Sequence, residues 1–238
     1  MVAVPYRGVR EDLDGLLAAA RRERAKVIYI SNPDNPMGSH WDAAELERFI
    51  AALPDETMLL LDEAYCETAT DFALPELDIL RPNVIRTRTF SKAYGLAGMR
   101  VGYAIGEAGL VSAFDRVRNH FGVTRLGQVA ALAALADQDW LRQVVGRVVA
   151  ARERLYRIAE DAGLSALTSQ ANFVAIDCGR DGDYAMQVLK ALERRGVFVR
   201  KPMAPGLDQY IRISVGPDAE MDIVAEELAS ALKSAHSA

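Results

Sequence analysis

The feature that most restricts the fold of this chain is an alternation of short β-rich runs with helical stretches, which continues to about residue 106. Strands are predicted at residues 27–31, 58–62, 84–90 and 101–105, and apolar residues at helical spacing predict helices at 12–24 and 42–52. This alternation is typical of crossover units that build a mostly parallel sheet. We therefore predict an α/β fold.

The second half of the chain follows a different pattern. Residues 110–159 are almost continuously helical in character, with expected breaks at 121–124 and 137–139. A smaller αβ unit is then predicted from strands at 172–177, 197–200 and 210–215 and helices at 184–194 and 219–233. We expect two domains, which span residues 1–136 and 137–238.

Composition argues against several classes of protein. The 28 Lys and Arg residues are outnumbered by 33 Asp and Glu, and the resulting charge of −5 argues against a nucleic-acid partner. The longest apolar run, residues 129–136, is far shorter than the roughly 20 residues that span a bilayer, so no membrane segment is predicted. Cys66 and Cys178 form no disulfide framework and are expected to be small buried side chains in a cytoplasmic protein. No metal site is predicted, and the absence of GxxxxGK[ST] disfavours a nucleotide-binding module.

Polar clusters follow three of the predicted strands. The first strand leads into NPDNPMG at 32–38, the second ends in DEAY at 62–65, and the third leads into TFSK at 89–92, with GLAGMR following at 95–100. The carboxyl ends of parallel strands meet at one edge of a sheet, where ligands bind in folds of this type. An amide, a carboxylate, a phenol, hydroxyls, an amine and a guanidinium are thus expected at one edge.

This set of groups suits a pyridine aldehyde that carries a phosphate. The ordered motifs NPDNPMG, DEAY and TFSKAYGLAGMRVGY resemble the fold type I aminotransferases that use pyridoxal 5'-phosphate, and most closely the histidinol-phosphate aminotransferase group. The resemblance covers nearly the whole chain. It implies a three-layer αβα large domain, present in part, and a smaller C-terminal α+β domain. It also implies a homodimer that transfers an amino group from an amino acid or amino phosphate to a 2-oxo acid by a ping-pong Schiff-base mechanism.

The resemblance also assigns roles near the reacting atoms. Lys92 corresponds to the lysine that forms the Schiff base and moves the substrate's α-proton. Asp62 corresponds to the partner of the pyridinium nitrogen, while Tyr65 and Asn35 correspond to residues that hydrogen-bond the phenolic oxygen of the cofactor.

Further residues are assigned to the cofactor phosphate and to the substrate. Thr89, Ser91 and Arg100 correspond to the phosphate-binding residues. Arg212, in the segment YIRISVG, resembles the arginine that binds the substrate α-carboxylate, and Asn172 is assigned to the substrate side of the site.

Two departures from the family pattern leave alternatives open. The segment VRNHF at 117–121 differs from the sequence expected there in histidinol-phosphate enzymes, so the substrate stays undetermined. The chain opens with MVAVPYRGVREDL, which resembles sequence some way into the large domain, and we expect a shortened chain that binds its cofactor weakly. The alternatives are an amino-acid phosphate decarboxylase of the same superfamily and a non-catalytic fragment.

Overall fold

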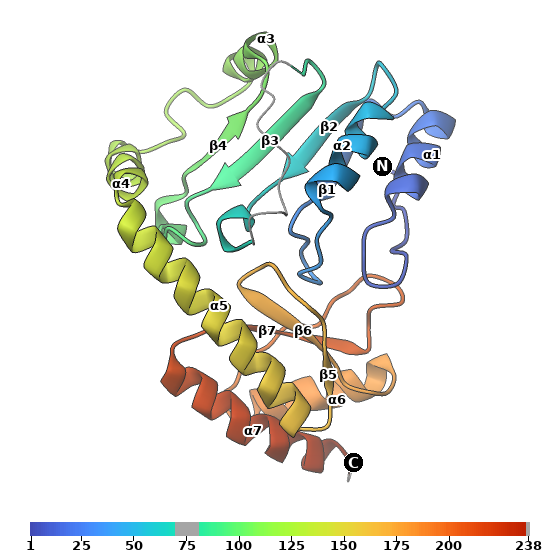
Figure 1. The fold of residues 1–238 in the computed structure, drawn as a ribbon, viewed down its shortest axis with the longest axis vertical. Coiled ribbons are helices and arrows are strands. Elements are labelled where there is room, and N and C mark those ends of the chain that lie inside the picture. Colours follow the sequence, from blue (N-terminus) through green and yellow to red (C-terminus); the bar gives the residue numbers. More distant parts are fainter. Residues whose placement is uncertain (70–80, 237–238) are drawn as a thin grey trace. The chain divides into compact units, whose positions relative to one another are not determined.

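The computed structural model describes residues 1–69 and 81–236, which form two compact units (Figure 1). Unit 1 contains residues 1–4, 11–34 and 40–145, and unit 2 contains residues 5–10, 35–39 and 146–238. The division between the two long segments falls inside a single helix, α5 (Gln138–Asp161).

Unit 1 is built on a four-stranded sheet in the order β1 (Val27–Ser31), β2 (Met58–Asp62), β3 (Val84–Thr89) and β4 (Gly102–Ile105). The first three strands run parallel and β4 is antiparallel, which confirms the predicted mostly parallel sheet. Because Ser31 pairs with Asp62 and Asp62 pairs with Thr87, the carboxyl ends of β1, β2 and β3 share one edge.

Two amphipathic helices cover one face of this sheet, α1 (Leu13–Glu23) and α2 (Ala43–Ala51). The Asp12 side chain caps α1 by accepting a hydrogen bond from the Gly15 amide, and Asp42 and Glu45 form a capping box at the start of α2. The shared core consists of alternate strand residues and the apolar stripes of the helices, among them Ile28, Ile30, Leu59, Leu61, Leu17, Leu46, Phe49 and Ile50.

The helical region that follows is more broken than predicted. Helix α3 (Ala108–Ser112) and a 3-10 turn (Ala113–Arg116) are short, and the next helices are α4 (Arg125–Ala136) and α5. The prediction of helix through residue 120 is wrong because the Asn119 side chain accepts a hydrogen bond from the Phe121 amide and forms a local turn. Thr124 then caps α4 through the Gly127 amide.

Unit 2 contains an antiparallel sheet of β5 (Ser165–Ala166), β6 (Phe173–Asp177) and β7 (Tyr210–Ser214) with helices α6 (Gly182–Glu193) and α7 (Asp218–His236). The predicted strand at 197–200 is wrong, since only Arg200 pairs there, in an isolated bridge with Arg212. The chain leaves α6 through Gly196 in the left-handed region, and Pro202 has no amide hydrogen with which to continue a ladder.

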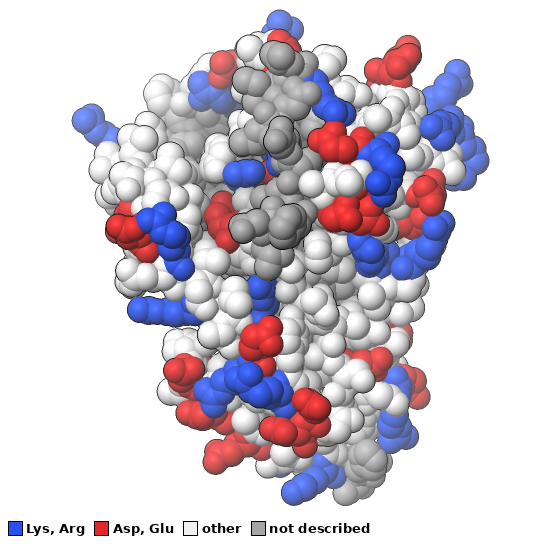
Figure 2. Space-filling view, viewed as in Figure 1, with Lys and Arg blue, Asp and Glu red and all other residues white. Residues whose placement is uncertain are grey.

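The surface and the helices add two observations. Basic and acidic side chains are interspersed on the face shown in Figure 2. Within residues 1–69 and 81–236, no helix combines the length and apolar character needed to cross a bilayer.

Candidate active site

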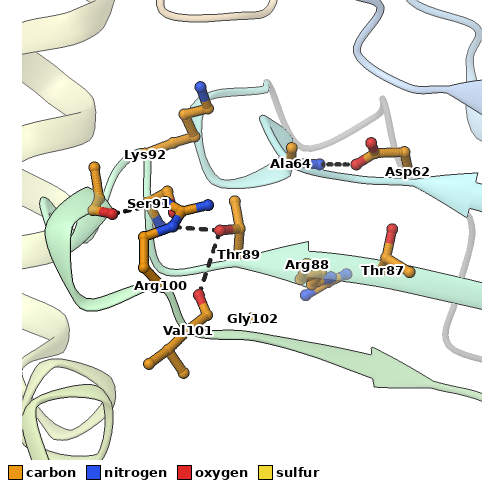
Figure 3. Close-up of a pocket in the computed structure, with 11 residues that line it drawn as sticks. Asp62, Ala64, Thr87, Arg88, Thr89, Ser91, Lys92, Arg100, Val101 and Gly102 are labelled. Atoms are coloured by element: carbon orange, nitrogen blue, oxygen red, sulfur yellow. Dashed lines mark hydrogen bonds between the residues drawn. The ribbon is translucent and has the colours of Figure 1, made fainter. Parts of the chain in front are cut away.

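A cavity of about 540 Å³ lies in unit 1 at the carboxyl ends of β2 and β3 (Figure 3). Five of the predicted site residues line it, together with residues of β3 and of the turn before β4. The lining residues include Asp62, Thr87, Arg88, Thr89, Ser91, Lys92, Arg100 and Val101. Asp62 lies apart from the group formed by Thr89, Ser91 and Arg100, so the cavity has a carboxylate in one region and hydroxyls with a guanidinium in another.

Lys92 lies in the turn that follows β3, and a backbone hydrogen bond between Lys92 and Gly95 closes this turn. The Lys92 carbonyl accepts a hydrogen bond from the Gly95 amide at 2.9 Å, and Gly95 has φ of 72°, which favours glycine. The Lys92 Nζ atom lies 4.9 Å from the centre of the Tyr65 ring. Tyr65 is not among the described residues that line the cavity, but its buried ring makes a cation–π contact with Lys92.

The hydroxyl group of Thr89 organises the turn between β3 and β4. Its Oγ1 accepts a hydrogen bond from the Ser91 amide at 3.1 Å and donates to the Val101 carbonyl at 3.4 Å. Arg100 has φ of 56° and donates from Nη1 to the Ala97 carbonyl at 2.7 Å. The turn therefore gathers two hydroxyls and an exposed guanidinium, groups that suit a phosphate.

Asp62 is the last residue of β2, and both of its carboxylate oxygens are hydrogen-bonded. Oδ1 accepts from the Ala64 amide at 3.0 Å, and Oδ2 accepts from the Tyr29 hydroxyl at 2.9 Å. Tyr29 was not among the site residues predicted from the sequence. The available signal was strand alternation, because Tyr29 is two residues before Ser31, which pairs with Asp62.

A buried ion cluster joins the ends of the same strands, and one of its members, Arg88, also lines the cavity. Glu63 is fully buried, and its Oε1 accepts from Arg86 Nε while its Oε2 accepts from Arg88 Nε, each at 2.8 Å. The Glu63 amide also donates to the Thr87 carbonyl at 2.8 Å. The cluster therefore holds the end of β2 against β3 next to Asp62 and Thr89.

A second carboxyl group lies at the end of β1. Glu11 Oε1 accepts from the Ser31 amide at 3.2 Å, and the Ser31 hydroxyl donates to Asp34 Oδ1 at 3.1 Å. Burial, together with the nearby carboxylates of Asp34 and Asp62, raises the pKa of Glu11 to about 8. Glu11 therefore keeps its proton near neutral pH.

Three predicted residues belong to unit 2. Arg212 donates from Nη1 to the amide oxygen of Asn35, and its guanidinium lies 4.6 Å from the centre of the Phe173 ring. The Asn172 carbonyl accepts from the Val215 amide at 3.0 Å, which ties it to the end of β7. Asn35 is absent from the described lining of the unit 1 cavity and instead forms a pair with Arg212.

The structure adds a second arginine beside this pair. The Arg200 amide donates to the Arg212 carbonyl at 3.1 Å, so the two residues are directly opposite in an antiparallel bridge. Directly opposite side chains project from the same face of such a pair. The sequence did not predict this pairing, because it depends on the register between the segment at 197–200 and β7.

Cys66 and Cys178 are free thiols, and both are buried, which confirms that they are small buried side chains. Cys66 follows the predicted site residue Tyr65 in the sequence. Burial raises the pKa of its thiol, which therefore stays protonated.

The fold and the cavity together define an α/β protein with a lysine in a cavity at the carboxyl ends of its parallel strands. The chain belongs to the aminotransferase class I and II family, whose sequence profile matches residues 1–228.

Comparison with individual proteins agrees with this assignment. The chain is 40% identical over 233 residues to histidinol-phosphate aminotransferase 2 of Pseudomonas aeruginosa, covering 97% of this chain and 62% of the relative. It is also 40% identical over 228 residues to an aromatic amino acid aminotransferase of Cutibacterium acnes, covering 94% and 62%.

Among solved structures, the chain is similar to histidinol-phosphate aminotransferase of Sinorhizobium meliloti in complex with pyridoxal-5'-phosphate. The TM-score is 0.95 at 53% identity, covering 98% of this chain and 64% of that one. The chain thus spans about three fifths of the length of the relatives it matches.

Proposed function

We propose that this chain carries the cofactor-binding and catalytic residues of a pyridoxal-phosphate-dependent aminotransferase. The observation that carries the proposal is the presence of Lys92 and Asp62 in one cavity with the hydroxyls of Thr89 and Ser91 and the Arg100 guanidinium. Membership of the aminotransferase class I and II family and similarity to the pyridoxal-5'-phosphate complex from Sinorhizobium meliloti support it.

The chemistry of the cavity fits this cofactor. Arg100 and the hydroxyls of Thr89 and Ser91 can donate to a phosphate, and the Asp62 carboxylate can accept from a protonated ring nitrogen. When bound, pyridoxal phosphate supplies an aldehyde that bonds to amines and a protonated ring that withdraws electrons from the substrate's α-carbon. Lys92 Nζ is then the group that bonds the aldehyde and moves the α-proton, with Tyr65 packed beside it.

Unit 2 supplies groups for the substrate. Arg212 presents a guanidinium suited to an α-carboxylate, and Asn172 and Asn35 are the amides assigned to the substrate side and to the cofactor. Arg200, opposite Arg212, adds a second cation that favours a substrate with a second anionic group. The amino donor is proposed to be an amino acid or an amino phosphate of the histidinol phosphate kind, with a 2-oxo acid as acceptor.

We further propose a cytoplasmic homodimer. Helix α4 exposes an apolar stripe, because Leu126, Val129, Leu132 and Leu135 are each at least 46% exposed and recur at every third residue. An apolar stripe of this kind favours association with another protein surface. Size-exclusion chromatography with light scattering tests this, and a monomer at micromolar concentration would contradict the homodimer.

The assignment of Lys92 is tested by intact-mass spectrometry of the purified chain after incubation with pyridoxal phosphate and reduction with borohydride. We expect one adduct that Lys92→Ala abolishes. The matched control is Lys26→Ala, which removes an exposed lysine of the same unit that pairs with Glu56. An adduct that persists in Lys92→Ala, or no adduct in the unmodified chain, would contradict the proposal. If an adduct forms, an amino-donor screen for keto-acid products separates transamination from decarboxylation.

A further inference from the structure

Tyr29 contacts Asp62, the acidic side chain among the described residues that line the cavity. Its hydroxyl donates to Asp62 Oδ2 at 2.9 Å, while the Ala64 amide donates to Oδ1 at 3.0 Å. Each carboxylate oxygen therefore has one donor, and the plane of the carboxylate is held by two neighbouring segments of chain. The Ala64 donor is part of the local backbone, whereas Tyr29 is 33 residues away on the adjacent strand.

The strands make this contact a consequence of register. Ser31 pairs with Asp62 and Tyr29 pairs with Leu60, so Tyr29 lies on the same face of the sheet as Asp62 and leans toward the strand end. Tyr29 is 52% exposed, so burial of its ring does not explain its position in β1. In the structure, the Tyr29 hydroxyl donates a hydrogen bond to Asp62.

The electrostatic surroundings of the phenol agree with a donor role. Partial desolvation raises the pKa of Tyr29, and the Asp62 charge and hydrogen bond raise it further, as does the nearby Glu11 carboxyl. A hydrogen bond involving Ser31 acts in the opposite direction. The raised pKa keeps the phenol protonated near neutral pH, where it donates to Asp62.

We propose that Tyr29 is a positioning residue for Asp62, which it holds in the orientation that receives a protonated pyridine nitrogen. This inference rests on the proposed function. A carboxylate that is already held by a fixed partner loses less rotational freedom when it binds its ligand. Hydrogen-bond partners behind metal ligands and catalytic groups act in the same way.

The first test uses the chain without cofactor. Tyrosine labelled with ¹³C at Cζ allows the titration of the phenol to be followed by NMR, and Tyr29→Phe identifies its resonance. We expect Asp62→Asn to lower the pKa of Tyr29 toward the usual tyrosine value of about 10. Asp55→Asn, which neutralises an exposed acid of the same unit, should leave the titration unchanged. A Tyr29 titration that Asp62→Asn does not alter would overturn the proposal.

The second test adds pyridoxal phosphate. Tyr29→Phe should weaken binding about fivefold and shift the absorbance maximum of the bound cofactor or the pH midpoint of its spectrum, because one hydrogen bond to Asp62 is lost. Tyr184→Phe, the same change in unit 2, should alter neither. Equal affinity and an identical spectrum in Tyr29→Phe would overturn the role of Tyr29 while leaving the proposed function intact. Failure of the unsubstituted chain to bind the cofactor at Lys92 would overturn both.

Discussion

Three acidic side chains near the carboxyl ends of β1 and β2 have different environments, although all belong to unit 1. Glu63 is fully buried between two arginines, Asp62 accepts from an amide and a phenol, and Glu11 is mostly removed from water beside other carboxylates. Burial without a cation favours the neutral form of a carboxyl group, whereas burial beside cations stabilises the charged form. The carboxyl groups thus have three roles: Glu11 holds a proton, Asp62 lines the cavity, and Glu63 pairs with buried arginines.

Glu11 makes stability depend on pH. Its pKa of about 8 in the folded chain exceeds the ordinary value of 4.5, so the folded state binds this proton more tightly. The stabilisation is complete below the ordinary pKa and is lost as pH rises through about 8. We expect the free energy of unfolding to fall between pH 5 and 8 by up to about 1.4 kcal/mol per pH unit.

Urea denaturation at several pH values measures this loss. In Glu11→Gln the slope over that range should flatten, because Gln stays neutral at every pH. Glu23→Gln, on the exposed side of α1, is the control and should keep the slope of the unsubstituted chain. An equal slope in Glu11→Gln would show that another group takes up the proton.

Glu63 is predicted to contribute far more to stability than an exposed ion pair. Glu63→Gln removes the buried charge that pairs with the buried Arg86 and the mostly buried Arg88 and should lower the free energy of unfolding by about 3 to 5 kcal/mol. Glu56→Gln, which breaks the exposed pair with Lys26, should change the free energy of unfolding far less, because solvent screens that pair. Similar losses in the two variants, measured by urea denaturation, would refute the buried-charge explanation.

At the scale of elements, the segment between β1 and α2 contributes to both units, with residues 35–39 belonging to unit 2. Asn32 begins it by accepting from the Trp41 amide at 2.8 Å and donating to the Trp41 carbonyl at 3.0 Å. Within unit 2, the Gly38 carbonyl accepts from the Gln170 amide at 2.8 Å. The segment 32–38, whose Asn, Pro and Gly residues suggested a ligand-binding turn, therefore also has a structural role.

Gly38 is the position in this turn where a side chain should be least tolerated. Its φ is 75°, and an added Cβ would lie 2.2 Å from Ser169 Oγ, a hydroxyl that donates to the Phe173 carbonyl. Gly38→Ala should therefore lower the free energy of unfolding by about 2 kcal/mol or more. Gly179→Ala separates the two causes, because its φ is 73° but no atom lies within 4 Å of an added Cβ. Its cost should be about 1 kcal/mol. Equal costs in thermal or urea unfolding would mean that backbone strain alone acts at Gly38.

The sequence predicted elements best where the pattern is local. The four strands of unit 1 and the strands at β6 and β7 were expected within one or two residues, because alternation and flanking turns mark them. The segment at 197–200 has strand-like residues but pairs only at Arg200, and the two residues of β5 are too few to form a pattern. Tyr29 and Arg200 were missed for a related reason, since their importance depends on register between strands that the sequence does not encode locally.

At the scale of the whole molecule, each unit has its own hydrophobic core. The core of unit 1 is formed by α1, α2 and the β1–β3 strands and includes Leu59, while the core of unit 2 is formed by α5–α7 with β6 and β7 and includes Leu192. The two clusters share no residue. Separate cores allow separate cooperative unfolding, with the stability of each set by its own packing.

Both tryptophans of the chain, Trp41 and Trp140, belong to unit 1, so tryptophan fluorescence reports on that unit. Leu59→Ala and Leu192→Ala each remove a fully buried side chain and should each cost about 2 to 5 kcal/mol in the unit concerned. We expect Leu59→Ala to lower the urea midpoint seen by fluorescence. Leu192→Ala should leave that midpoint in place and lower only the midpoint of the helical signal seen by circular dichroism. If Leu192→Ala shifts the fluorescence midpoint as far as Leu59→Ala does, the two cores unfold as one, and α5, which crosses the division between the units, is the element that couples them.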